Sequence, residues 1–358
     1  MKVKRGLALI GIIFLLIGTS FASSLGVKNT SNSLKISKVT DERPELKDNA
    51  FQYNGEDTWI EWWFFTMYDV EKDIQLCFSY SILLNETSGL AIMMVIGFDK
   101  DKKYDIRNYY ERSEFYASYE KPNVSIGEDC NIKALDENTF IIKGKTQNGK
   151  IMWNFTYNRL IKPYQHLGDF GWLCYMPSAE VAGNAEIDGI SYNITGYGYH
   201  DHNWMTITED LLTQWRWAET YDSNNNISII FSLAGNWIFT GDLAVIIGEE
   251  TIIFDNPKIS YKKFAINLTI SQQQLLLSIY PRTWHIKADN GEYSADITVN
   301  VYKNNPLFLG GFTYLVNEQV SGFNGEIKCK DTTYILNTQG FSEYTKFSIF
   351  DLFLFDIF

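Results

Sequence analysis

The sequence predicts an all-β protein made of antiparallel strands. Aromatic residues make up 16% of the 358-residue chain and proline occurs only 7 times, and aromatic side chains suit the pleated surface of a sheet. From Phe51 onward, short apolar or alternating runs are separated by turn signals, without a long helical period. This pattern is typical of an antiparallel meander.

The expected strands and turns follow one another along the chain. The clearest strand-like runs are Trp59–Tyr68, Leu76–Leu84, Ala91–Phe98, Thr139–Lys145, Ile151–Tyr157, Ile227–Leu233 and Ile266–Ile270. Hairpin turns are expected at Asn148-Gly149, Asp188-Gly189 and Asn290-Gly291, and one short helix between Glu209 and Trp215. Such sheets can close into barrels, which removes their edges and leaves room for one small ligand.

The first residues are expected to be an export signal. Basic residues precede the apolar run Leu7–Ile17, and the segment Ser20–Ala22 offers the small residues that a signal peptidase reads. We expect cleavage after Ala22, which leaves 1–22 as the signal peptide and 23–49 as a linker. The apolar run is short for a spanning helix; left uncleaved, it would anchor the protein to a membrane. The expected location is secreted or extracytoplasmic.

Two further features fit export. Seven Asn-X-Ser/Thr triplets offer glycosylation sites, at Asn29, Asn85, Asn123, Asn154, Asn193, Asn226 and Asn267. The four cysteines are far apart and form no Cys-x-x-Cys pair, which argues against a zinc ribbon or a thioredoxin-type motif. One or two disulfides remain open among Cys77, Cys130, Cys174 and Cys329.

Composition narrows the class of protein. The formal net charge of -12 argues against a nucleic-acid partner, because nucleic acids are bound through Lys and Arg. The length allows two domains, and 45% hydrophobic residues allow substantial cores. The sequence has no Gly-x-Ser-x-Gly elbow, which argues against a serine hydrolase.

The stretch 196–204 concentrates reactive side chains and includes two of the four histidines. In an extended backbone, successive side chains point to opposite faces. One face then carries His200, His202 and Trp204, and the other carries Tyr197, Tyr199, Asp201 and Asn203. Asp201 and His202 are candidates for proton transfer beside an aromatic wall. The alternative is a strand end whose polar groups satisfy one another.

A second motif surrounds Glu61 with aromatic residues between Trp59 and Phe65. A carboxylate in such surroundings must find a cation or hydrogen-bond donors, or stay protonated. Arg216, which lies between two tryptophans, is the expected partner. A buried Glu61–Arg216 pair would fix the strand register; a direct role of Glu61 in chemistry is the other interpretation, and both stay open.

A metal site is a weaker alternative. His200 and His202 share one strand face, and a carboxylate could complete a set of two histidines and one acid. His166 and His285 are the only further histidines. We therefore expect neither a metal nor another cofactor.

Several motifs resemble those of the carotenoid 1,2-hydratase (hydroxyneurosporene synthase) family and its lipocalin-like relatives of the AttH type. The resemblance spans roughly residues 51–344 and rests on Glu61-Trp62-Trp63, Met176-Pro177, the 196–204 stretch and the Gly340–Tyr344 run. It implies two lipocalin-like barrels in tandem, with the main cavity near their junction. The expected domains are 50–206 and 207–346, followed by an apolar tail, 347–358. Met205 departs from the family, which usually has Gly there.

The resemblance also implies a chemistry. Hydration of an isolated alkene begins with protonation of carbon, which needs an acid kept neutral by apolar surroundings. Glu61 and Asp201 are the candidate acids, with Asp222 as a third, and His202 would position water or accept its proton. The resulting cation would be stabilised by aromatic faces, and His200 would shape the pocket. The candidate aromatic residues are Trp62, Trp63, Tyr199, Trp204, Trp215 and Trp217.

Two functions follow from this reasoning. The first is an enzyme that hydrates or cyclises an isoprenoid or polyene. The second is a secreted lipocalin-type carrier that binds an apolar ligand without chemistry. The C-terminal tail is too short to span a bilayer, and it could be a final strand, an extension or a segment in peripheral contact with a membrane.

Overall fold

The computed structural model describes residues 44–85, 87–167, 171–206, 214–235, 239–271, 274–309 and 314–347. The expected signal peptide, most of the expected linker, most of the expected helix before Trp215 and nearly all of the apolar tail lie outside these residues. Within them, no helix is long and apolar enough to cross a membrane.

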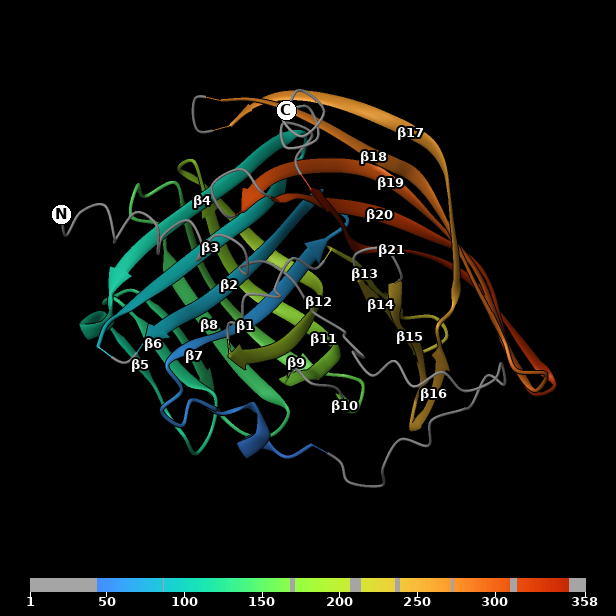
Figure 1. The fold of residues 1–358 in the computed structure, drawn as a ribbon, viewed down its shortest axis with the longest axis horizontal. Coiled ribbons are helices and arrows are strands. Elements are labelled where there is room, and N and C mark those ends of the chain that lie inside the picture. The colour runs from blue at the N-terminus through green and yellow to red at the C-terminus, as the bar shows by residue number, and fades with distance from the viewer. Residues whose placement is uncertain are drawn as a thin grey trace, which may run out of the picture. The chain divides into compact units, whose positions relative to one another are not determined.

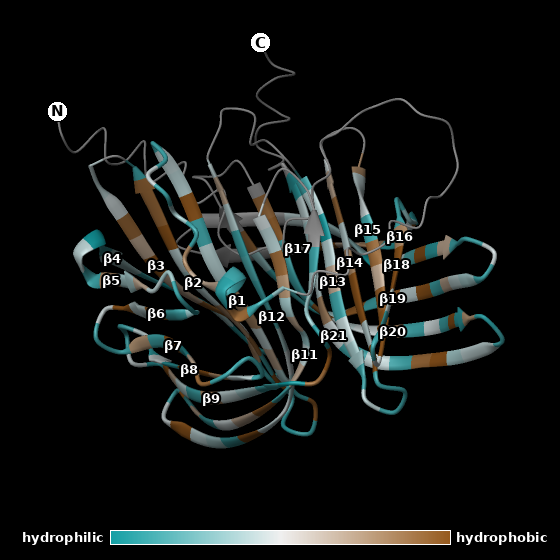
Figure 2. Cartoon of the chain, turned by 90° about the horizontal axis from the view of Figure 1, so that it is seen from below, coloured by the Kyte–Doolittle hydropathy of each residue, from teal (hydrophilic) through white to brown (hydrophobic). Residues whose placement is uncertain are grey.

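The expected fold class is confirmed, because the described residues form two antiparallel sheets (Figure 1). The helical elements described are two short 3-10 helices, η1 (Leu46–Asn49) and η2 (Arg112–Glu114). Each of the expected strands is present. Figure 2 shows apolar and polar residues alternating along strands such as β19 and β20.

The first sheet curls into a nearly closed barrel. Eleven of its described strands follow the order β4-β3-β2-β1-β12-β11-β9-β8-β7-β6-β5, and β10 pairs with β11. The two end strands, β4 and β5, are joined by the three residues of η2. The strands are β1 (Thr58–Asp69), β2 (Ile74–Asn85), β3 (Gly89–Asp99), β4 (Lys102–Glu111), β5 (Phe115–Ala117), β6 (Asn123–Ile126), β7 (Cys130–Ala134), β8 (Thr139–Lys145), β9 (Ile151–Arg159), β10 (Tyr164–Leu167), β11 (Gly171–Ile187) and β12 (Ile190–Thr206).

The second sheet is a curled half-barrel rather than a closed barrel. Its nine described strands follow the order β16-β15-β14-β13-β21-β20-β19-β18-β17. They are β13 (Gln214–Asp222), β14 (Ile227–Gly235), β15 (Phe239–Ile247), β16 (Glu250–Asp255), β17 (Lys258–Ser271), β18 (Gln274–Asp289), β19 (Tyr293–Leu309), β20 (Tyr314–Cys329) and β21 (Thr332–Phe347).

The hairpin β11–β12 forms where the sequence predicts it. Its turn is Asp188-Gly189, and both residues have positive φ, +50° and +81°, as a tight hairpin turn requires. The two strands run together for most of their length and shift register around Met176 and Ala179. Pro177 lies in this irregular part, where a residue without an N–H is tolerated.

The interior of the first barrel is aromatic. On β1, the residues that point into the main core cluster include Trp59, Trp63, Phe65 and Met67. This is the alternation expected of a strand with one face on a core. The alternate residues of β1, such as Trp62, are also buried.

The residues just before β1 pack into this barrel. Asn49, Ala50 and Phe51 are buried, and the backbone N–H of Phe51 donates to the carbonyl of Ser118 at 3.0 Å. The Phe51 ring packs against four aromatic rings, those of Tyr53, Trp63, Phe115 and Tyr119. Of the described residues of the expected linker, Glu45, Lys47 and Asp48 are exposed and Asn49 is buried.

No disulfide joins the four cysteines in the structure, and three of them are buried. Burial raises the pKa of the Cys130 thiol, so this group stays protonated at neutral pH. Neither of the disulfides left open by the sequence is formed.

Replacing Phe51 with Ala tests the packing of the segment before β1. Because Phe51 is almost fully buried among four rings, we expect a loss of about 3–5 kcal/mol in the free energy of unfolding. Urea unfolding followed by fluorescence measures this change. Tyr116→Ala is the matched control, since Tyr116 is 62% exposed and should cost less than about 0.5 kcal/mol. Equal stability of the two variants would contradict the burial of the segment.

Candidate functional site

The centre of the candidate site is a set of facing residues on β1 and β12. The two strands are antiparallel, with Glu61 opposite Trp204, Trp63 opposite His202, and Phe65 opposite His200. Directly opposed side chains on one face lie within contact distance. The alternation predicted for the 196–204 stretch therefore brings both histidines and Trp204 to the same face as Glu61.

Glu61 and His202 form a hydrogen-bonded pair that is fully buried. His202 Nε2 lies 2.8 Å from Glu61 Oε1. The same carboxyl accepts a bond from the backbone N–H of Gln52 (2.9 Å to Oε1) and one from Trp59 Nε1 (2.9 Å to Oε2). The Glu61 carboxyl is therefore held in place by hydrogen bonds to three different parts of the first barrel.

Burial pushes both members of this pair toward their uncharged forms. It raises the pKa of Glu61 well above its usual value, against the smaller effect of the bonds from Trp59 and Gln52. It lowers the pKa of His202 well below its usual value, helped by the neighbouring His200. Both shifts favour a carboxylic acid bonded to a neutral imidazole, with one proton shared across the 2.8 Å bond.

One atom of the pair remains unused. His202 Nδ1 is buried and has no hydrogen-bond partner of ordinary geometry, although the backbone carbonyl of Asp48 lies near enough to favour a proton on the ring. With Glu61 donating to Nε2, Nδ1 carries the imidazole proton. This N–H is therefore buried near the Asp48 carbonyl without a hydrogen bond of ordinary geometry.

Three tryptophans surround the pair. The ring of Trp63 stacks on His202 with centroids 4.6 Å apart and planes at 8°, and the Trp204 ring lies 4.6 Å from His202 at 43°. Trp204 occupies space that only a glycine opposite it leaves free, because a Cβ on Gly171 would lie 1.8 Å from the indole ring. Together with Trp59, these rings form an apolar, electron-rich cage around the acid.

Beside these tryptophans, the His200 ring is fixed by hydrogen bonds at both of its nitrogens. Its Nδ1 lies 2.9 Å from the carbonyl of Phe64, and its Nε2 lies 2.9 Å from the side-chain nitrogen of Asn49. The carbonyl can only accept, so Nδ1 carries the proton and Nε2 accepts from Asn49. The ring also stacks on Phe65 at 3.9 Å. Burial lowers the pKa of His200 to about 3, so the ring is neutral.

Asp201 belongs to a separate group on the opposite face of β12. Its carboxylate accepts bonds from Tyr199 (2.7 Å), Trp172 (2.9 Å) and Asn203 (2.8 Å). All of these residues are buried. Trp62, opposite Asn203 in the register, is also on this face, and so is Met205, two residues beyond Asn203. The sheet therefore separates Asp201 from the Glu61–His202 pair.

The remaining predicted residues lie in the second sheet. Trp215 Nε1 donates to Glu343 at 2.7 Å, and Trp217 lies opposite Glu343 in the register. Asp222, considered as a third acid, accepts bonds from Asn224 and Asn225 in the turn after β13.

The expected pairing of Glu61 with Arg216 is wrong. Arg216 donates to the backbone carbonyls of Trp215 (2.7 Å) and Thr345 within the second sheet. The hydrogen-bond partners of Glu61 are instead His202, Trp59 and Gln52. The Trp59 indole N–H and the Gln52 backbone N–H thus supply the hydrogen bonds that were expected from a cation.

The described residues contain no group of three or more His, Cys, Asp or Glu side chains that could hold a metal ion. For His200 the reason is direct, because both ring nitrogens are engaged by Asn49 and Phe64.

Sequence reasoning missed the contribution of the segment before β1. Asn49 binds His200 through its side chain, its carbonyl accepts from Trp63 Nε1 at 3.0 Å, and Gln52 binds Glu61 through its backbone. Backbone donors have no sequence signature, so Gln52 could not have been found. Trp59 was visible, since it is two residues from Glu61 on the same strand face.

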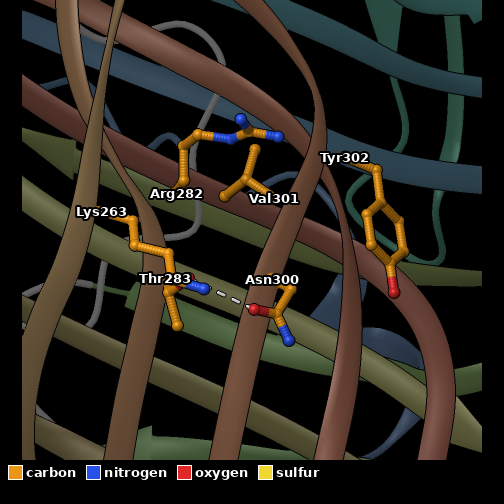
Figure 3. Close-up of a pocket in the computed structure, with 6 residues that line it drawn as sticks. All are labelled: Lys263, Arg282, Thr283, Asn300, Val301 and Tyr302. Carbon is orange, nitrogen blue, oxygen red and sulfur yellow. Dashed lines mark hydrogen bonds between the residues drawn. The ribbon is translucent and has the colours of Figure 1, made fainter.

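A cavity of about 370 Å³ lies on the second sheet (Figure 3). It contains none of the site residues predicted from the sequence. Asn300 accepts a bond from Thr283 at 3.3 Å across it. The lining residues are Lys263, Arg282, Thr283, Asn300, Val301 and Tyr302.

The buried His200 makes the protein less stable in acid. Its pKa is about 3 in the folded protein against 6.5 in an unfolded chain, so below pH 6.5 only the unfolded chain takes up the proton. The free energy of unfolding then falls with decreasing pH by up to about 1.4 kcal/mol per pH unit from this group. His202 acts in the same direction. Glu61 acts oppositely, since its raised pKa contributes stability below pH 4.5 that is lost as the pH rises.

The variant His200→Asn keeps a donor for the Phe64 carbonyl but has no group that titrates in this window. We expect it to be less stable than the unmodified protein at neutral pH, with a shallower fall toward about pH 4. Urea unfolding at several pH values measures both slopes. Parallel curves for the two proteins would contradict a neutral, buried His200.

No family model and no curated protein match the chain, whereas solved structures do. A candidate AttH protein from Nitrosomonas europaea matches with a TM-score of 0.64 at 13% identity, over 86% of this chain and 98% of that one. Kievitone hydratase from Nectria haematococca matches with a TM-score of 0.55 at 14% identity, over 92% and 99%. CghA matches with a TM-score of 0.57 at 9% identity, over 82% and 89%. The chain therefore has the fold of AttH and kievitone hydratase, which confirms at the level of the fold the resemblance seen in its motifs.

Proposed function

We propose that the protein binds an apolar isoprenoid or polyene beside the Glu61–His202 pair and catalyses its acid-assisted hydration or cyclisation. The observation that carries this proposal is a fully buried carboxyl whose pKa is raised by burial, bonded at 2.8 Å to a histidine whose pKa is lowered by burial and enclosed by tryptophans. An acid in this state can protonate a weak base such as an alkene, which an ionised carboxylate cannot do.

The proton reaches the ligand through His202. Glu61 gives its proton to Nε2 while Nδ1, the unpartnered ring nitrogen, gives its own to an alkene carbon. A C–H bond forms, the π bond breaks and a tertiary carbocation results. Water then attacks the cation, and the proton released from it returns to Nδ1 while Nε2 gives its proton back to Glu61. If a second alkene of the same ligand attacks instead, a C–C bond forms and the charge moves to a new carbocation, which loses a proton from a neighbouring carbon to Nδ1. Both routes restore the original state of the pair.

The tryptophans supply the second requirement of this chemistry. A carbocation in an apolar site needs stabilisation that does not add a nucleophile, and indole faces provide it through their electron-rich π systems. Trp204 is the most accessible of the three, since it is only partly buried, whereas Trp59 and Trp63 are buried. Trp204 would therefore lie along the ligand and the other two around the acid.

The solved structures with this fold are consistent with the proposal. One of them is a hydratase by name, and CghA has been crystallised with the small molecule Sch210972. The ligand of the present protein is expected to be of similar apolar character. Asp201, bonded to Tyr199, Trp172 and Asn203 on the other face, would hold β12 in register and position His202 on the inner side.

The alternative function is a carrier that binds an apolar ligand without chemistry. The dense hydrogen bonding of Glu61 favours it, because three hydrogen bonds already hold that carboxyl in place. The two functions differ in one outcome, the formation of a new C–H bond.

The variant Glu61→Gln tests the proposal. Glutamine fills the same space and can bond His202, but it has no proton to give. With farnesol as the probe, incubation in D₂O should yield a hydrated or cyclised product carrying deuterium on carbon. We expect Glu61→Gln to bind farnesol normally and to turn it over about 10²- to 10⁴-fold more slowly.

The matched control is Glu180→Gln, which changes an exposed glutamate on β11 and should leave the rate unchanged. Trp204→Ala should weaken both binding and turnover. Binding of farnesol without deuterium incorporation by the unmodified protein would establish the carrier instead. Absence of farnesol binding would contradict both functions for this class of ligand.

A further inference from the structure

The second sheet contains a buried cation that the proposed chemistry does not use. Arg216 on β13 is 5% exposed. Its Nη1 donates to the backbone carbonyls of Trp215 and Thr345, whereas its Nε is buried without a partner. The guanidinium lies over two aromatic rings, 3.9 Å from the centroid of Tyr344 and 4.7 Å from that of Phe239.

A second cation shares this face. Lys346 follows Tyr344 by two residues on β21, and Tyr344 lies opposite Arg216, so the three side chains point the same way. Burial and the charge of Arg216 lower the pKa of Lys346. Two positive groups have thus been brought together at an electrostatic cost, in a protein whose net charge is -12.

No carboxylate among the described residues forms an ion pair with either cation. The carboxylate of Glu343 accepts from Trp215 on the other face of the sheet. The neighbouring polar residues Asn304, Asn317 and Gln319 are neutral amides already bonded to one another or to the backbone. A buried charge without a counter-charge is costly, and none of the described carboxylates supplies one.

We propose that Arg216 and Lys346 bind the carboxylate of an otherwise apolar ligand. The guanidinium fork suits two carboxylate oxygens, and its Nε side is the part that the backbone carbonyls leave free. The surroundings suit a hydrocarbon body, because Tyr261, Trp284 and Tyr344 pack edge to face within 6.2 Å of one another. This site is carried by the second sheet alone and does not depend on the Glu61–His202 pair.

Binding of dodecanoate and of dodecan-1-ol to the full-length protein tests the proposal, with titration calorimetry as the measurement. The two probes share a chain and differ only in the charged head. We expect dodecanoate to bind about tenfold or more tightly than the alcohol, since charge-assisted bonds are the stronger ones. Arg216→Gln should remove this preference, and Lys346→Met should reduce it.

Arg282→Gln is the matched control, because Arg282 lines the separate cavity of Figure 3 and should not affect the preference. Thermal unfolding without ligand separates a binding role from a structural one. Loss of an unpaired buried charge should leave the melting temperature of Arg216→Gln unchanged or higher, and dodecanoate should stabilise only proteins that retain Arg216. Arg216→Lys, which keeps the charge but not the fork, provides the same comparison if the glutamine variant does not fold.

Equal affinity for acid and alcohol in the unmodified protein would overturn the proposal. So would an equal loss of preference in Arg282→Gln, or a lower melting temperature of Arg216→Gln with unchanged preference. Displacement of dodecanoate by inorganic phosphate would assign the cations to free phosphate and overturn the apolar acid as ligand. Glu61 is unchanged in each of these variants, so none of these outcomes bears on the proposed hydration.

Discussion

The bond between Glu61 and His202 is the interaction on which the candidate site depends. It joins β1 to β12 across 141 positions of sequence, and it is buried, so neither partner can lose the other without leaving a polar group unsatisfied. The same bond makes the acid and the base a single titrating unit. Each group would be costly to bury alone, and sharing one proton between them offsets this cost in their apolar surroundings.

The alternation of β12 separates two polar centres that lie next to each other in the sequence. His202 and Asp201 are neighbours in the chain, yet one faces the tryptophans of the barrel interior and the other faces Tyr199 and Trp172. The second centre is saturated by its donors. In the first centre, His202 Nδ1 has no hydrogen bond of ordinary geometry. It is the atom through which the proposed proton transfer would pass.

The sequence was sufficient for the class of fold and for the two strands that carry the site. Period-two alternation predicted the face shared by His200, His202 and Trp204, and the Asp188-Gly189 signal predicted the hairpin behind them. The sequence did not identify the partner of Glu61. A buried carboxyl can be satisfied by a cation or by neutral donors, and composition favoured Arg216, whereas topology supplied His202 and a backbone N–H. The burial of Asn49 could not be predicted either, because a polar residue at the end of a polar stretch does not indicate that it packs inside a barrel.

The segment before β1 has a consequence for how the protein folds. The first sheet closes through contacts between residues far apart in the chain, and such contacts form slowly because a large loop must be ordered first. The Gln52 N–H bonds Glu61 from only nine residues away, whereas the Glu61–His202 bond can form only after β12 has joined β1. Assembly of the proton-sharing pair therefore waits for a contact across 141 positions of sequence. A chain arrested before this step would have most of its strands, but its Glu61 carboxyl would be open to water and ionised. It would lack the raised pKa that burial gives this group.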